Sequence, residues 1–90
     1  VFAAIQFKSN DMEDLYFGLA IDHVKNRVNG LDVVHAQNLL KDEPDTTIDD
    51  IDSALADMIY DLMEEYGEDN DLPEGWWLEY GDVQDVLMKL

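Results

Sequence analysis

The 90-residue chain has no cysteine, and it has only five basic residues against 22 acidic ones, for a formal net charge of −17. The absence of cysteine excludes disulfides and thiolate metal sites, and it fits a reducing compartment. No segment approaches the roughly 18 to 20 consecutive apolar residues that span a bilayer, and residues 1–7 lack the basic region and cleavage site of a secretory signal. We therefore expect a cytoplasmic protein that does not enter membranes.

The charge is divided unevenly along the chain. Residues 1–41 hold five acidic and four basic residues, whereas residues 42–90 hold seventeen acidic residues and a single basic one, Lys89. Such a field repels nucleic acid and membrane surfaces and attracts a basic partner at rates well above the neutral limit. A merely solubilising surface would intersperse Lys and Arg, because unrelieved self-repulsion destabilises a compact protein. The charge thus predicts a basic protein partner and no direct binding of nucleic acid.

Length and a 47% apolar composition suit one domain, residues 1–90. The apolar run at residues 1–8 predicts a strand, and residues 76–80 (WWLEY) predict a second short strand that could pair with it. Trp76 and Trp77 would then point to opposite faces of that strand. A two-stranded sheet does not stand alone in water. The predicted fold is therefore α+β, with a small two-stranded sheet packed against three or four helices and the pairing direction left open.

A long first helix is predicted after Asn10, with Glu13 completing a capping box and Gly30 ending the helix. Its apolar residues recur at steps of three and four, which is the periodicity of a helix with one buried face. These residues are Met12, Leu15, Tyr16, Leu19, Ala20, Val24 and Val28.

Two shorter helices are also predicted. One covers residues 33–41 with Asp32 as its N-cap, although the two valines at its start also permit a strand. The other covers residues 83–90, begins at Asp82 and follows a turn-rich loop over residues 68–75.

The strongest pattern in the chain belongs to a third helix, which follows Thr46 and Thr47 and is predicted to end at Gly67. One face of this helix is apolar and is predicted to be buried. Its residues are Ile48, Ile51, Leu55, Met58, Ile59, Leu62 and Tyr66.

The opposite face of the third helix carries a row of carboxylates. At 100° per residue, five of them fall within about 60° of one another. With the acidic residues beside them, carboxylates recur about every 4 Å over about 28 Å, whereas one strand of B-DNA presents a phosphate about every 3.4 Å. The row consists of Asp50, Asp57, Asp61, Glu64 and Glu68, flanked by Asp49, Asp52 and Glu65.

This spacing suggests that the acidic face imitates a phosphate backbone. A solvated helix face is the simpler alternative, but like charges without Lys at i+4 cost a few tenths of a kcal/mol each, and solubility does not require them. We expect the partner-binding surface to extend beyond the helix. It is predicted to comprise Asp49, Asp50, Asp57, Asp61, Glu64, Glu65, Glu68, Asp69, Asp71, Glu74 and Glu79.

No catalytic or metal-binding constellation is recognisable. The chain has no Gly-x-Ser-x-Gly turn and no phosphate-binding glycine loop, and His23 and His35 are expected to have structural roles. The stretch from Asp69 resembles a calcium loop, but its fifth and sixth places are Pro73 and Glu74 where the template needs an oxygen ligand and Gly. We expect no enzymatic activity, no cofactor and no specific metal site.

A small, cysteine-free, acidic domain whose longest helix carries such a row resembles the phage-encoded DNA-mimic inhibitors, most of all the Arn-type anti-restriction proteins of T-even bacteriophages. The resemblance rests on size, on the acidic stretch of residues 42–85 and on the row of carboxylates. It implies a homodimer, in the bacterial cytoplasm, that occupies the DNA-binding surface of a restriction endonuclease or another host DNA-binding protein. It implies no catalytic residue.

Two alternatives belong to other classes of protein. The pair Asp52-Ser53 is similar to the site at which acyl carrier proteins attach phosphopantetheine, and residues 82–90 are similar to their last helix. The carrier motif, however, reads Gly-x-Asp-Ser-Leu, whereas this chain lacks the Gly and has Ala54 before Leu55. An immunity protein that neutralises a basic nuclease toxin would use the same electrostatics as a restriction inhibitor.

Overall fold

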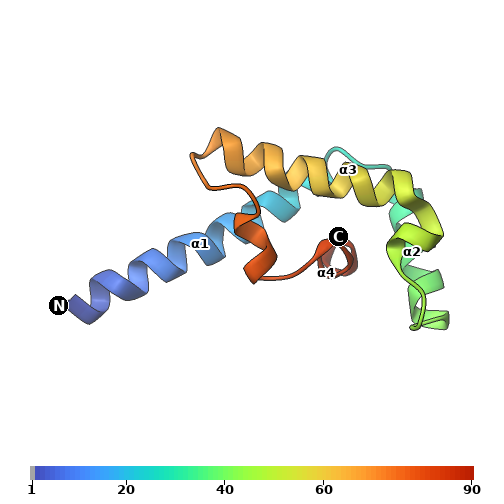
Figure 1. Cartoon of the computed structure of the whole chain (residues 1–90), viewed down its shortest axis with the longest axis horizontal. Helices are drawn as coiled ribbons and strands as arrows, with labels where there is room; N and C mark the ends of the chain where they lie inside the picture. Colours follow the sequence, from blue (N-terminus) through green and yellow to red (C-terminus); the bar gives the residue numbers. More distant parts are fainter. Residues whose placement is uncertain (1) are drawn as a thin grey trace.

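The computed structural model describes residues 2–90, with side chains described from Asp14 onward. Its elements are α1 (Phe2–Lys25), α2 (Gly30–Asp42), α3 (Ile48–Asp69), the 3-10 helix η1 (Trp76–Glu79) and α4 (Val83–Lys89). The first part of α1 projects away from the other helices, and the chain ends directly after α4, which lies below α3 and beside α2 in this view (Figure 1). Over the described part of the chain, every helix is too short or too polar to cross a membrane.

Residues 2–90 contain no β-strand, so the predicted two-stranded sheet is wrong and the fold is all-helical. Residues 2–8 of the first predicted strand are the start of α1, and Val1 lies outside the described residues. This segment includes two Ala, a Gln and a Lys, which are good helix formers, and a short apolar run has no periodicity that separates strand from helix. Residues 76–79 form a 3-10 turn instead of a strand, entered through Gly75 in the left-handed conformation (φ 73°).

The junction between α1 and α2 also differs from the prediction. Asn10 lies inside α1 and is not its N-cap, and α1 ends at Lys25 rather than at Gly30. Gly30 is the first residue of α2, and the cap is Asn29, whose side-chain oxygen accepts backbone N–H bonds of 2.8 and 3.4 Å from the first turn. Asp32 therefore lies in the first turn, where a negative charge favours the helix dipole. The helix predicted over residues 33–41 is confirmed, and the strand alternative is excluded.

The last two α-helices begin where the sequence predicts. Thr47 caps α3 by accepting a bond from the backbone N–H of Asp50 at 3.3 Å. Asp82 caps α4 in a reciprocal capping box with Asp85, in which each side chain accepts from the other residue's backbone N–H. Such caps satisfy N–H groups that have no partner within the helix, each stabilising by about 1 kcal/mol.

Helix α3 is kinked at Asp52, whose backbone is not helical (φ −157°, ψ 87°). The side chain of Asp52 accepts from the backbone N–H of Leu55 at 3.1 Å, so it acts as an N-cap for the segment that follows. After the kink, the buried face of α3 is centred on Ile59, and Met58 lies about 100° away from that residue around the helix. Met58, predicted to be buried, is 46% exposed, while Ala56 and Met63 lie in the core.

The core lies where α1, α2 and α4 pack against α3. Its largest fully buried side chains come from each of these helices except α2, together with one from η1. A hydrogen bond of 2.8 Å from the side chain of Gln37 on α2 to the backbone carbonyl of Leu87 fixes α4 beside α2. These largest fully buried side chains are Trp77, Ile59, Met63, Leu87, Val24 and Val86.

Gly67 does not end α3, which continues to Asp69. Its role is to make room for Trp76, because a Cβ placed on Gly67 would lie 2.4 Å from the indole nitrogen and 2.6 Å from Cδ1 of that ring. Both tryptophans of η1 are buried in this way, Trp76 over the last turns of α3 and Trp77 in the core.

We predict that Gly67→Ala lowers the free energy of unfolding, although alanine is the better helix former by about 1 kcal/mol. The added methyl group must displace Trp76, and overpacking of this kind costs about 1 to 3 kcal/mol. Urea denaturation monitored by tryptophan fluorescence measures the difference.

The matched control is Gly18→Ala in α1, where nothing lies within 4 Å of the added Cβ. This variant should be more stable than the parent by about 0.5 to 1 kcal/mol. Equal gains in the two variants would show that Trp76 does not pack on Gly67.

Candidate functional site

Three carboxylates form the centre of the acidic face of α3. Asp57, Asp61 and Glu68 are exposed, and at 100° per residue they lie within about 40° of one another, opposite the fully buried Ile59. No Lys, Arg or His of the described side chains forms an ion pair with any of the three. Their charges are therefore not compensated by an ion pair with any described side chain.

Ten of the eleven carboxylates predicted for the surface are exposed; Glu64 is the exception. Glu65 has an imidazole as its neighbour, because its Oε2 lies 4.0 Å from Nε2 of His23, a largely buried histidine. The ten exposed carboxylates divide among three parts of the structure. Asp49, Asp50, Asp57, Asp61, Glu65, Glu68 and Asp69 lie on α3, Asp71 and Glu74 lie in the following loop, and Glu79 lies in η1.

The kink at Asp52 interrupts the predicted line of charge. Asp49 and Asp50 precede it and belong to the first turn of α3, whereas the remaining carboxylates of the row follow it. The estimate of 28 Å assumed one straight helix and so does not describe the structure. From Asp57 to Glu68 the continuous part of the row rises about 17 Å at 1.5 Å per residue.

Glu64 has an internal role that the sequence pattern does not show. Its Oε1 accepts the backbone N–H of Gly75 at 2.9 Å and the indole N–H of Trp77 at 3.3 Å, and its Oε2 lies 3.2 Å from the same Gly75 nitrogen. A carboxylate that accepts such bonds is held more firmly than one accepting from water. Glu64 thus attaches η1 to α3, and its charge is not presented like that of its neighbours.

Tyr60 lies beside this contact, on the edge of the acidic face. Its ring meets that of Trp77 edge to face, with 5.4 Å between centroids and 70° between planes. Glu64 is the main cause that raises the pKa of Tyr60 above its ordinary value of 10.0, followed by desolvation and by the charge of Glu74. Ionisation of the phenol is opposed because it would add a negative charge to a negative field.

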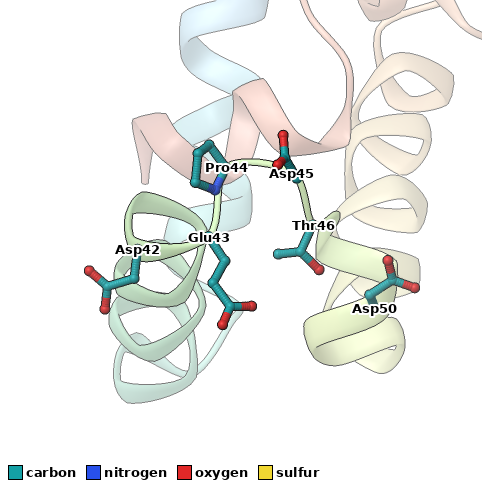
Figure 2. Close-up of a pocket in the computed structure, with 6 residues that line it drawn as sticks. All are labelled: Asp42, Glu43, Pro44, Asp45, Thr46 and Asp50. Atoms are coloured by element: carbon teal, nitrogen blue, oxygen red, sulfur yellow. The ribbon is translucent and has the colours of Figure 1, made fainter.

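A second concentration of carboxylates lies at the turn from α2 to α3. A hollow of about 480 Å³ lies there, and Figure 2 shows Glu43 and Asp50 extending from its two sides. Asp42 and Asp45 complete its acidic lining. The sequence-based surface included only Asp50 of these residues, because carboxylates of a turn have no helical period by which to group them, although the acidic run at residues 42–50 was visible.

Ser53 is exposed and follows directly after the kink. With Asp52 as the N-cap, Ser53 is the first residue of the helical segment that leads to Asp69. Its hydroxyl therefore lies at a helix start, and no hydrogen bond joins it to the described side chains.

Two further observations bear on function. Within residues 14–90, no three His, Asp or Glu side chains come together in a way that could hold a metal ion. Comparison of the chain with known protein families, curated proteins and solved structures found no match to any of them. The functional proposal therefore depends on the charge and geometry of the residues described above.

We predict that Glu64→Ala destabilises the protein by about 1 to 3 kcal/mol, because it leaves the N–H groups of Gly75 and Trp77 without their acceptor. It should also lower the pKa of Tyr60 toward 10.0, since Glu64 is the largest cause of the increase. Urea denaturation and an NMR titration of the tyrosine ring signals measure the two effects.

Glu68→Ala is the matched control, one turn further along α3 and exposed. It should change the stability by no more than about 0.5 kcal/mol. If both variants unfold at the same urea concentration, Glu64 does not hold η1 in place.

Proposed function

We propose that the protein is a non-enzymatic inhibitor that mimics nucleic acid and occupies the basic DNA-binding surface of another protein, such as a restriction endonuclease. The observation that carries this proposal is the group of three exposed carboxylates on one face of α3, Asp57, Asp61 and Glu68, with no cationic partner among the described side chains. In a helix of this kind, Lys at i+4 would relieve the repulsion at no cost in solubility. A surface that keeps its charges uncompensated is suited to a partner that supplies the cations.

Energetics favour a partner whose groove is lined by Lys and Arg. Such a groove is built to neutralise phosphates, and a protein that fills it gains the same charge pairing that DNA provides. The negative field of residues 42–90 would also accelerate the encounter, because steering between opposite charges raises association rates. The same field opposes contact with DNA itself, so we propose no direct binding of nucleic acid.

The kink makes the acidic surface two groups of charge instead of one line. One group lies on α3 after Asp52, and the other surrounds the hollow at the turn from α2 to α3. DNA-binding proteins contact phosphates in clusters on either side of a groove, and most of their hydrogen bonds to DNA go to phosphates and sugars. Two separated acidic groups can therefore imitate two such clusters. A homodimer, which we also propose, would double the number of groups presented.

We predict that the variant Asp57→Asn, Asp61→Asn, Glu68→Gln folds normally but binds its target at least about tenfold more weakly. None of the three side chains is buried, and their removal relieves like-charge repulsion, so the stability should hold or rise. Glu64 is left unchanged because it holds η1. Competition against duplex DNA for a purified modification-dependent restriction endonuclease, together with a thermal melt, measures binding and stability.

The control variant Asp14→Asn, Asp22→Asn, Asp32→Asn removes the same charge from exposed positions in the other half of the chain. This control should compete almost as well as the parent. The affinity of the parent for its target should fall steeply as salt is added, because opposite charges are screened within about 8 Å at physiological ionic strength. Equal losses in the two variants would mean that net charge alone matters. Unimpaired competition by the α3 variant would reject the proposal, and competition for a nuclease toxin instead would favour an immunity protein.

One structural observation favours the carrier-protein alternative. Carrier proteins are helical, residues 2–90 of this chain contain no β-strand, and Ser53 is exposed at a helix start capped by Asp52. The departures from the carrier motif remain, since the Gly is missing and Ala54 separates Ser53 from Leu55. Inhibition by charge mimicry accounts for the uncompensated carboxylates on α3. A carrier protein would not require them.

We predict that the protein keeps its unmodified mass when it is co-expressed with a phosphopantetheinyl transferase. Intact-mass spectrometry of the parent and of Ser53→Ala measures this. A gain of one phosphopantetheine in the parent that Ser53→Ala abolishes would establish a carrier protein and overturn the inhibitor proposal.

A further inference from the structure

An apolar groove of about 290 Å³ lies where the start of α3, η1 and α4 meet. Ile48, Tyr60, Leu78 and Val83 supply its apolar lining, and Asp49 and Asp82 supply carboxylates. Ile48 is buried, so the groove opens directly onto the core of the domain.

Two large side chains of this groove are exposed to solvent. Leu78 is 46% exposed and Tyr60 is 37% exposed. The groove is lined entirely by residues from 47–84, a stretch without Lys or Arg. Neither Asp49 nor Asp82 forms an ion pair among the described side chains, and Asp82 uses only one carboxylate oxygen, Oδ1, to cap α4 at 3.0 Å.

We propose that this groove binds an arginine side chain of the basic protein that the acidic face attracts, an inference that rests on the proposed function and adds a specific anchor to it. An arginine has a long apolar stem and a planar cationic head. The stem would lie against Leu78 and Val83, and the guanidinium group would reach the carboxylates of Asp49 and Asp82, with which it can form paired hydrogen bonds.

The chemistry of the groove favours arginine over the other candidates. An aliphatic or aromatic side chain would leave the two carboxylates without a cation, and an acidic one would be repelled by them. Lysine has a strongly hydrated ammonium group that is less readily brought against an apolar wall. Tyr60 also lines the groove, and an aromatic ring can make a favourable contact with a cation. The charge of Glu64 makes this edge negative, as the raised pKa of Tyr60 indicates.

This anchor has a role that the carboxylate row cannot fill. Exposed charge pairs are screened and contribute little each, whereas a few residues seated in pockets carry most of the energy of an interface. Arginine is among the residue types enriched at such positions. The row would provide attraction and the groove would fix the orientation of the partner.

The test uses two fluorescent peptides of equal charge, nona-arginine and nona-lysine, titrated onto the full protein and followed by anisotropy. The parent should bind nona-arginine more tightly. Leu78→Ser should weaken nona-arginine binding by about fivefold or more and change nona-lysine binding little. Leu31→Ser on α2, where the leucine is 82% exposed and remote in sequence from the groove, is the matched control and should behave as the parent.

NMR of the unmutated protein gives an independent measurement, because the methyl signals of Leu78 and Val83 should shift with nona-arginine while those of Leu31 do not. An absence of shifts at Leu78 and Val83, or a loss with Leu78→Ser that is equal for both peptides, would overturn the groove proposal. If the parent binds both peptides and the α3 variant does not, the acidic face still attracts a basic partner. If the parent binds neither, that attraction fails too.

Discussion

The attachment of η1 to α3 is the contact on which the rest of the structure depends. Here the indole of Trp77 is buried completely, and its N–H and that of Gly75 both reach the carboxylate of Glu64. A buried tryptophan removes on the order of 150 to 250 Å² from water, more than any other side chain. Burying the indole N–H of Trp77 without an acceptor would be costly, and Glu64 provides that acceptor from the surface of the helix. One carboxylate of the acidic face therefore stabilises the core.

Helix α3 must both supply apolar side chains to the core and carry carboxylates on its outer side. Its buried side supplies Ile59 and Met63 to the core, while its outer side carries the charges that oppose compaction. The free energy of burial must exceed that repulsion, and the two buried tryptophans of η1 add apolar contacts at the end of α3. Gly67 contributes to this packing, since only a residue without a side chain lets the ring of Trp76 approach the helix so closely.

The sequence predicted those parts of the fold that depend on neighbouring residues. The starts of α3 and α4 followed from Thr47 and Asp82, because a cap satisfies N–H groups only three residues away. The predicted sheet was wrong because residues 1–8 have an apolar composition without a clear period. Pairing of that segment with residues 76–80 would also depend on tertiary contacts between distant parts of the chain, which local sequence patterns do not show. Neither the kink at Asp52 nor the role of Glu64 was predicted. The kink was missed because an aspartate within a helical pattern looks like one more surface charge. The role of Glu64 was missed because its contact with Trp77 spans 13 residues.

The internal cap at Asp52 has a consequence for how the chain folds. Helix formation is limited by its first turn, which is costly to nucleate. Because α3 has one cap at Thr47 and another at Asp52, the segment from Ser53 onward can nucleate without the turn that precedes it. That segment holds most of the apolar residues that α3 gives to the core, so it can serve as the template on which α1, α2 and η1 assemble.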